Sequence, residues 1–258
     1  MRFVNQTRLL VESGMSGATG NIYVGLHEFE DMGFVLHALR PDDLFFDIGA
    51  NIGSYTVLAA GGVGATCVSV EPVPSTYQWL LKNVGLNGLQ ERVTCWNVGV
   101  GEEQGVLRFT QGHGPCNKVL GEGQVTEDSV EVPVTTLDRL FEKVNIPGDE
   151  TAVIVKVDTE GYEVPILQDS EIPFRNAPTA FILELDGSGS HYGFDESRIH
   201  QLLNKAGYKA VSYSPFQRQL HVISDKRREG NTVYVNDLDF FSRRVSNSAR
   251  YSVINKYV

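Results

Sequence analysis

The feature that most constrains the fold is an apolar run that breaks into a glycine-rich turn and then into a helical pattern. The run reads LFFDI at residues 44–48, and the turn reads GANIG at residues 49–53. Apolar residues at three- and four-residue spacing follow from Tyr55. A buried strand, a tight glycine turn and a helix N-terminus in this order form a ligand-binding corner in open α/β sheets. The sequence therefore predicts such a corner here.

Further apolar runs predict an α/β fold with a doubly wound, mostly parallel sheet. Buried strands are expected at residues 65–70, 93–98, 152–157 and 180–186. Runs with helical spacing separate the strands at residues 44–48, 65–70 and 93–98, and this alternation indicates βαβ units with parallel pairing. The final runs, at residues 210–213, 220–224 and 232–235, lack spacers long enough for such crossovers. The sheet is therefore expected to finish antiparallel.

The distribution of these apolar runs divides the chain into three segments. Residues 1–40 form an N-terminal accessory segment, with a short strand at residues 21–25 followed by an amphipathic helix. Residues 41–236 form the main domain. Residues 237–258 form a C-terminal tail, and its basic residues indicate a solvated end or a contact in a dimer.

Two runs that alternate apolar and polar residues predict a β-hairpin inserted in the main domain. They lie at residues 106–110 and 130–134. The polar loop that begins after the first run contains His113 between glycines and can fold over a pocket.

Composition limits the partners that this chain can have. Its formal net charge is −10, which argues against binding along a nucleic acid backbone, because such binding needs clustered Lys and Arg. The three cysteines, Cys67, Cys95 and Cys116, show no Cys-x-x-Cys spacing, so a reducing compartment without structural disulfides is expected. No signal core and no membrane span is apparent in the sequence. We expect a soluble, cytoplasmic protein that binds a small molecule or a glycan and can form a homo-oligomer.

The glycine spacing argues against a dinucleotide at the predicted corner. The dinucleotide fingerprint requires glycines at relative positions 0, 2 and 5. Placed on Gly49, these positions hold Gly49, Asn51 and Ser54, and Gly53 falls one residue early. Asp47 is also poorly placed beside a pyrophosphate. A dehydrogenase is therefore disfavoured.

S-adenosylmethionine fits the corner better, because it has a cationic amino-acid end and a neutral nucleoside end. Asp47 is placed to bind its α-ammonium group, and Glu71, which ends the second strand, to accept hydrogen bonds from two ribose hydroxyls. Asn97 and Val98, at the end of the third strand, would flank the adenine. The predicted cofactor-binding residues are Asp47, Gly49, Asn51, Gly53, Glu71, Asn97 and Val98.

Four motifs of this chain resemble those of FkbM-type methyltransferases. They are FDIGANIG at residues 46–53, VEP at 70–72, TLD at 136–138 and VKVDTEGYE at 155–163. The last motif is the most specific, and the resemblance covers roughly residues 40–215. It implies a class I, Rossmann-like fold that uses S-adenosylmethionine, and usually methyl transfer to a hydroxyl oxygen of a sugar or natural product.

Acidic residues at two neighbouring strand ends are the candidates for the chemistry. Asp158 and Glu160 end the fourth buried strand, and Glu184 and Asp186 end the fifth. Like charges this close must be relieved by protonation, a basic partner or a metal ion. One mechanism uses a carboxylate or a histidine as general base on the acceptor hydroxyl. In the other, Asp158 and Glu184 hold Mg²⁺ or Mn²⁺, which orients the hydroxyl and lowers its pKa.

His113 and His191 are the histidine candidates because both lie in glycine-rich loops. The predicted catalytic residues are Asp158, His191 and Glu184. The negative charge of the chain favours a neutral or cationic acceptor. N-methylation of a small amine stays open, because carboxylates can bind a cationic acceptor, and so does a non-catalytic nucleoside-binding protein of the same fold.

Overall fold

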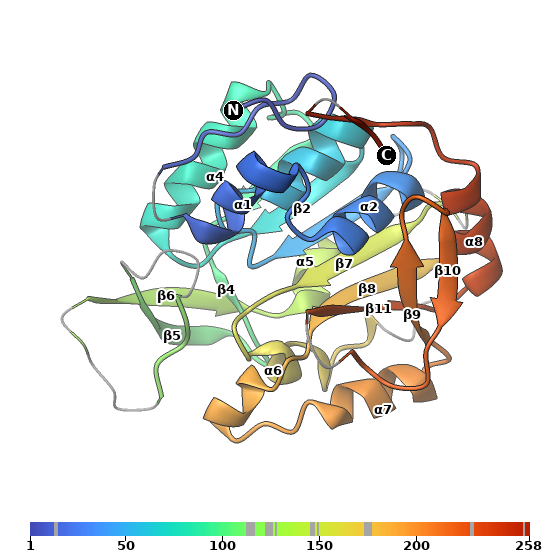
Figure 1. The fold of residues 1–258 in the computed structure, drawn as a ribbon. Coiled ribbons are helices and arrows are strands. Elements are labelled where there is room, and N and C mark those ends of the chain that lie inside the picture. Colours follow the sequence, from blue (N-terminus) through green and yellow to red (C-terminus); the bar gives the residue numbers. More distant parts are fainter. Residues whose placement is uncertain are drawn as a thin grey trace.

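A sheet of parallel strands with an antiparallel finish forms the centre of the molecule (Figure 1). The computed structural model describes residues 1–12, 15–111, 117–121, 126, 128–144, 148, 150–172, 177–227, 230–254 and 256–258. Among these residues, the sheet has the strand order β10-β9-β11-β8-β7-β1-β2-β3. Its strands are β1 (Leu44–Ile48), β2 (Thr66–Val70), β3 (Val93–Trp96), β7 (Val153–Val157), β8 (Thr179–Glu184), β9 (Lys209–Ser214), β10 (Gln219–Val222) and β11 (Asn231–Val235).

The pairing confirms the predicted fold class. Strands β3, β2, β1, β7 and β8 run parallel, whereas β11 runs antiparallel to β8 and β9, and β10 runs antiparallel to β9. The order reverses at β1, which lies between β2 and β7. Ligands bind at such a reversal, beyond the carboxyl ends of the strands.

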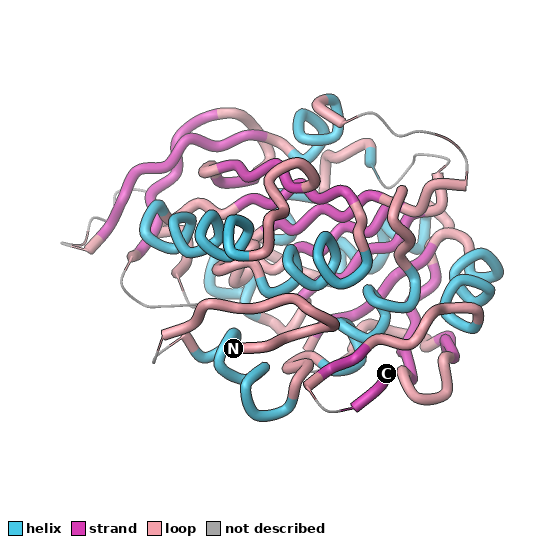
Figure 2. Tube along the Cα trace, turned by 90° about the horizontal axis from the view of Figure 1, so that it is seen from above, coloured by secondary structure: helices cyan, strands magenta, loops and turns pink. Residues whose placement is uncertain are grey.

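Helices cover both faces of this sheet, as the views from the side and from above show (Figures 1 and 2). Successive residues of the buried strands face opposite layers, so Phe45 and Phe46 pack in two different hydrophobic clusters. The helices α2, α4 and α8 contribute to the first cluster, and α5, α6 and α7 to the second. The helices are α1 (Ser16–Val24), α2 (Phe29–Ala38), α3 (Ser54–Thr56), the π-helix η1 (Val57–Val63), α4 (Pro74–Leu86), α5 (Leu137–Glu142), α6 (Glu163–Leu167), the 3₁₀-helix η4 (Ser188–Tyr192), α7 (Ser197–Lys205) and α8 (Leu238–Ser246).

A second, smaller sheet projects from the side of the body (Figure 1). It pairs β4 (Gly99–Val100) with β6 (Ser129–Thr135) in parallel, and β6 with β5 (Gly105–Thr110) antiparallel. The strands β5 and β6 contain the two alternating runs of the sequence. A short pair, β12 (Ser252–Val253) and β13 (Lys256–Tyr257), lies near the C-terminus.

Two expectations about the ends of the chain are wrong. Residues 21–24, predicted as part of a strand, form the last turn of α1, which is capped by Gly25 with a φ of +87°. The tail is not a solvated end, because α8 buries Phe241 and Val245, and Arg244 pairs with Asp43. No helix in the described ranges has both the length and the apolar character that crossing a bilayer requires.

Candidate active site

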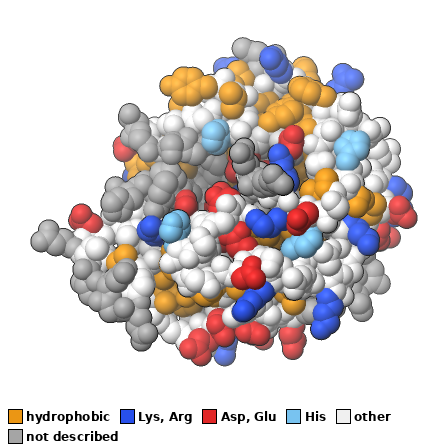
Figure 3. Space-filling view, turned by 60° about the horizontal axis from the view of Figure 1, so that its bottom comes forward, with side chains coloured by type: hydrophobic (Ala, Val, Ile, Leu, Met, Phe, Trp, Pro, Cys, Tyr) orange, Lys and Arg blue, Asp and Glu red, His pale blue; other side chains and the backbone are white. Residues whose placement is uncertain are grey.

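A cavity of about 400 Å³ opens beside β1, where the strand order reverses. This volume lies within the range of small-molecule sites. The turn after β1, the ends of β2, β7 and β8, and the residues before and within α2 provide its walls. On the face drawn in Figure 3, acidic side chains gather around a central hollow.

The turn after β1 approaches the backbone after β7 too closely for any side chain. Gly49 has a φ of +81°, and a Cβ added there would lie 1.9 Å from the carbonyl oxygen of Asp158. Asn51 and Gly53 also have positive φ, of 52° and 90°. The amides of Gly49 and Ala50 both donate to the carbonyl of Val70, at 3.0 and 2.9 Å. The glycines thus make a compact turn that leaves its outer side open to a ligand.

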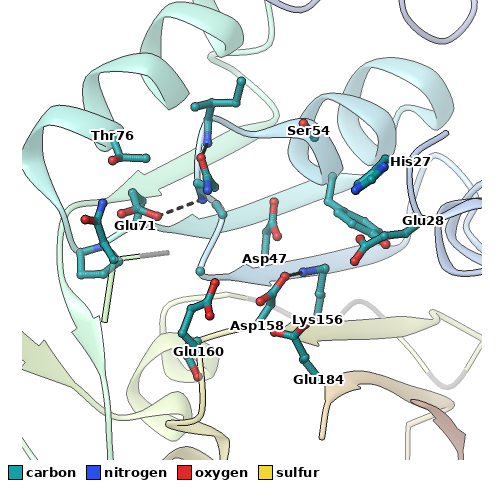
Figure 4. Close-up of a pocket in the computed structure, with 18 of the residues that line it drawn as sticks. His27, Glu28, Asp47, Ser54, Glu71, Thr76, Lys156, Asp158, Glu160 and Glu184 are labelled. Atoms are coloured by element: carbon teal, nitrogen blue, oxygen red, sulfur yellow. Dashed lines mark hydrogen bonds and ion pairs between the residues drawn. The ribbon is translucent and has the colours of Figure 1, made fainter. Parts of the chain in front are cut away.

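Glu71 holds this turn from the end of β2. Its Oε2 accepts a hydrogen bond from the amide of Asn51 at 2.9 Å, and its Oε1 accepts one from the amide of Val73 at 3.0 Å. Burial raises the pKa of Glu71 to about 7, against the effect of these two donors. Each carboxylate oxygen can accept more than one hydrogen bond, so Glu71 keeps capacity for ligand hydroxyls. It lies at one end of the cavity (Figure 4).

Asp47 lies between the two ends of the cavity (Figure 4). It is 2% exposed, and its Oδ2 accepts a hydrogen bond of 2.6 Å from the hydroxyl of Thr56. The Thr56 hydroxyl also lies 2.7 Å from the Oγ of Ser69. Burial raises the pKa of Asp47, whereas the ammonium of Lys156 lowers it. Asp47 is therefore a fixed acidic group next to the glycine turn.

Lys156, Asp158 and Glu184 form a coupled group at the ends of β7 and β8. The ammonium of Lys156 pairs with Asp158 and lies 4.7 Å from the centre of the Tyr55 ring. Burial acts to raise the pKa of Asp158, but the charge of Lys156 and a hydrogen bond with Glu184 lower it below its usual value. Burial and the charge of Asp158 raise the pKa of Glu184 to about 9. Glu184 is therefore protonated at neutral pH and shares its proton with ionised Asp158.

The segment before and within α2 supplies a wall of the cavity that the sequence did not assign. His27, Glu28 and Met32 line it. Asn231 lies at the start of β11. Its side-chain nitrogen, Nδ2, donates to Oε1 of Glu28 at 3.1 Å and to Oδ2 of Asp31 at 3.2 Å. The prediction of an accessory segment at residues 1–40 did not single out Glu28. Only its acidic type before an amphipathic helix could have drawn attention to it.

The predicted cofactor residues fall into two groups. Asp47, Gly49, Asn51 and Glu71 line the cavity, and Gly53 shapes the turn between them. Asn97 and Val98 are not among the lining residues. The side-chain amide of Asn97 donates to the carbonyls of Glu71 and Pro72, both at 2.8 Å, and so fixes the loop that carries Glu71. Val98 lines a small adjoining cavity, which shares Gly49 and Pro72 with the main one.

The predicted catalytic residues are also divided. Asp158 and Glu184 meet in the cavity, but His191 is exposed and does not line it. Its Nδ1 lies 3.0 Å from the carbonyl of Ser188, within η4. The other candidate, His113, lies outside the described residues. The structure therefore does not bring His191 together with Asp158 and Glu184, and its catalytic role stays a prediction.

A metal ion at Asp158 and Glu184 is not supported. Within the described residues, no group of three or more His, Cys, Asp or Glu side chains could hold one. The ammonium of Lys156 already supplies the positive charge beside Asp158. S-adenosylmethionine does fit the residues present, because Glu71 has free acceptor capacity and Asp47 offers a carboxyl group to an ammonium.

Comparisons with known proteins show which proteins this chain is similar to. A family model described as the methyltransferase FkbM domain matches residues 47–210. Hexuronic acid methyltransferase AglP of Haloferax volcanii is 26% identical over 173 residues, which cover 67% of this chain and 66% of that protein, slightly less than two thirds of its length. Two solved structures are also similar. Methyltransferase FkbM of Methylobacillus flagellatus has a TM-score of 0.47 and 16% identity, with 88% of this chain and 56% of that chain covered. O-methyltransferase TomG of Streptomyces achromogenes has a TM-score of 0.46 and 13% identity, with 88% and 91% covered.

Proposed function

The chain belongs to the FkbM methyltransferase family, and we propose that it transfers a methyl group from S-adenosylmethionine to a hydroxyl oxygen of a sugar, glycan or natural product. The observation that carries this proposal is one cavity with Glu71 at one end and the Lys156, Asp158 and Glu184 group at the ends of β7 and β8. The likeness to a hexuronic acid methyltransferase supports a sugar as acceptor.

The donor end of the cavity is assigned to Glu71, Asp47 and the glycine turn. Glu71 would accept hydrogen bonds from the ribose hydroxyls, since in the described part of the chain each of its oxygens accepts from one backbone amide and can accept again. Asp47 and the outer side of the turn at Gly49 face the amino-acid part. When bound, S-adenosylmethionine supplies an electrophilic methyl group on a positively charged sulfur.

Glu184 is the residue that we propose takes the proton of the acceptor hydroxyl. The hydroxyl oxygen forms a bond to the methyl carbon, the bonding pair of the broken bond returns to sulfur, and the hydroxyl proton must leave. A group with a raised pKa is the stronger base once ionised, and Glu184 has such a pKa whereas Asp158 does not. Asp158 orients Glu184 through their hydrogen bond while Glu184 carries its proton, and Lys156 keeps Asp158 ionised.

The proposal is tested by transfer of a labelled methyl group to a panel of glycosides, with donor binding measured by calorimetry. Because Glu184 acts in its ionised form, turnover should rise as the pH increases from 7 towards 9, the approximate pKa of Glu184. Glu184→Gln should lower kcat roughly 10²- to 10⁴-fold and remove this pH dependence.

An exposed acid distant from the cavity provides the control. Glu91→Gln should keep both the rate and the pH profile of the wild type. Binding of NAD without binding of S-adenosylmethionine would contradict the proposed donor. A Glu184→Gln variant with full turnover would instead show that another group takes the proton.

A further inference from the structure

Carboxyl groups dominate the described lining of the cavity. The lining contains the acids Glu28, Asp47, Glu71, Asp158, Glu160 and Glu184. The described lining residues include one lysine, Lys156, and no arginine. The ammonium of Lys156 is paired with Asp158. The described walls therefore offer no unpaired lysine or arginine to an acceptor that carries a carboxylate.

Glu28 lies at the end of the cavity opposite Glu71, with Asp47 between them (Figure 4). Glu28 also lies near Lys156, whose pKa its charge helps to raise, and so on the side of Glu184, where we propose that the acceptor hydroxyl lies. The side-chain amide of Asn231 donates to Glu28 at 3.1 Å and so fixes the carboxyl group from β11. The same amide donates to Asp31 at 3.2 Å. Glu28 is thus a positioned acid and not a mobile surface side chain.

A second observation at this wall also points to a ligand. Tyr55 lines the cavity and is 5% exposed, and its hydroxyl lies within hydrogen-bonding reach of Glu28, so its oxygen can still accept from a ligand. Burial, then the charges of Glu28 and Asp31, raise the pKa of this hydroxyl, so the hydroxyl stays neutral beside them. Buried polar groups in proteins are almost always hydrogen-bonded. A ligand group with hydrogens to donate can satisfy the tyrosine oxygen and the Glu28 carboxylate together.

We propose that the acceptor carries a basic nitrogen, as an amino sugar does, and that its ammonium binds Glu28 while a neighbouring hydroxyl faces Glu184. The inference rests on the proposed function and names the substrate class of the same site. An ammonium supplies three donors and a positive charge, which the carboxylate of Glu28 and the oxygen of Tyr55 both accept. A uronate would place a carboxylate next to that of Glu28, where the described lining offers no unpaired lysine or arginine, and is disfavoured by repulsion.

The experiment compares methyl glycosides of an amino hexose, a neutral hexose and a hexuronic acid. Their Kd values are measured by calorimetry on the full chain with S-adenosylhomocysteine present, and methyl transfer is then measured with S-adenosylmethionine. The amino hexoside should bind about tenfold or more tightly than the neutral hexoside, with the uronide weakest. The Glu28→Gln variant should lose this roughly tenfold preference, and higher salt should reduce it in the wild type.

Glu30→Gln is the matched control, because Glu30 lies two residues further on, pairs with Arg227 and is not a lining residue. It should keep the preference of the wild type. Tighter binding of the uronide than of the amino hexoside would overturn the inference and leave the proposed function standing. So would a preference for the amino hexoside that survives in the Glu28→Gln variant. Methyl transfer to the nitrogen would overturn the placement of the ammonium at Glu28. Binding of none of the three glycosides would also overturn it, and absence of donor binding would overturn the proposed function as well.

Discussion

Individual acids in this protein are buried to a degree that changes their charge. Burial raises the pKa of Asp31, Glu71 and Glu163 to about 7, although each also accepts hydrogen bonds that act in the opposite direction. Lys156 is the counterpart: burial alone would lower its pKa, but the charges of nearby acids, Asp158 first, raise it. Burial therefore keeps a larger share of Asp31, Glu71 and Glu163 protonated near neutral pH than their ordinary pKa values would.

Glu163 allows a prediction about pH at the scale of one residue. It is fully buried, and its Oε1 accepts from the amide and the hydroxyl of Thr159, both at 2.8 Å, while its Oε2 has no hydrogen-bond partner among the residues that the structure describes. Its pKa rises from 4.5 to about 7 on folding, so its proton stabilises the folded state below pH 4.5, and this contribution is lost as the pH rises through 7.

Urea unfolding at pH 5, 6.5 and 8 measures this effect. The fall in the free energy of unfolding between pH 5 and 8 should be smaller in Glu163→Gln than in the wild type, by roughly 1–3 kcal/mol. The comparison uses differences between proteins, because His37, with its pKa lowered to about 4 mainly by burial, acts in the opposite direction below pH 6.5. Exposed Glu142→Gln should follow the wild type. Parallel curves for Glu163→Gln and the wild type would refute the prediction.

The elements of the sheet were predictable because buried parallel strands are continuous apolar runs. The run at residues 44–48 is β1 with every residue buried, and the acids at the ends of β7 and β8 meet because parallel strands end at one edge. Residues 21–24 were misread because Ile22 and Val24 are typical of strands, whereas in α1 both are exposed. Propensity is a weak guide where tertiary packing decides the structure.

The parts of the site that the sequence did not predict depend on contacts between segments that lie far apart in the chain. Glu28 is positioned by Asn231, a residue 203 positions away, and no local pattern connects the two. Asn97 ends the third buried run as expected, but only the folded chain shows that the carbonyls of Glu71 and Pro72 occupy its amide. The end of a strand therefore predicts that a side chain lies near the site and not which way it points.

The turn after β1 gives a prediction at the scale of one element. Gly49→Ala places a Cβ 1.9 Å from a backbone oxygen at a φ of +81°, so the turn must move away from Asp158. We expect a loss of roughly 2–4 kcal/mol in the free energy of unfolding from strain and crowding. Binding of S-adenosylmethionine, measured by calorimetry, should weaken as well.

Gly105, at the start of β5, is a suitable control because no atom lies within 4 Å of a Cβ added there. Gly105→Ala should change the free energy of unfolding by no more than about 0.5 kcal/mol. A Gly49→Ala variant as stable as Gly105→Ala, with wild-type donor binding, would show that the close approach to Asp158 is not needed.

At the scale of the whole molecule, the two ends of the chain are joined on one side of the sheet. Val4 forms a bridge with Val253, and the amide of Asn5 donates to the carbonyl of Ser252 at 2.7 Å. Figures 1 and 2 both place the two termini on the same side of the molecule. The end segments therefore belong to the core that supports the site, and the accessory segment carries Glu28 into the cavity wall.

Arg244 of α8 secures this arrangement at the start of β1 and gives the last prediction. Its guanidinium donates to both oxygens of Asp43, at 2.6 and 3.2 Å, and to the carbonyl of Glu150 at 2.8 Å. Because Asp43 is 2% exposed, Arg244→Ala leaves a buried carboxylate without its partner and should lower the free energy of unfolding by about 3–5 kcal/mol. Arg243→Ala, at the exposed neighbouring position, should change it by less than about 0.5 kcal/mol. Equal urea midpoints for the two variants would mean that α8 is held by its apolar face alone.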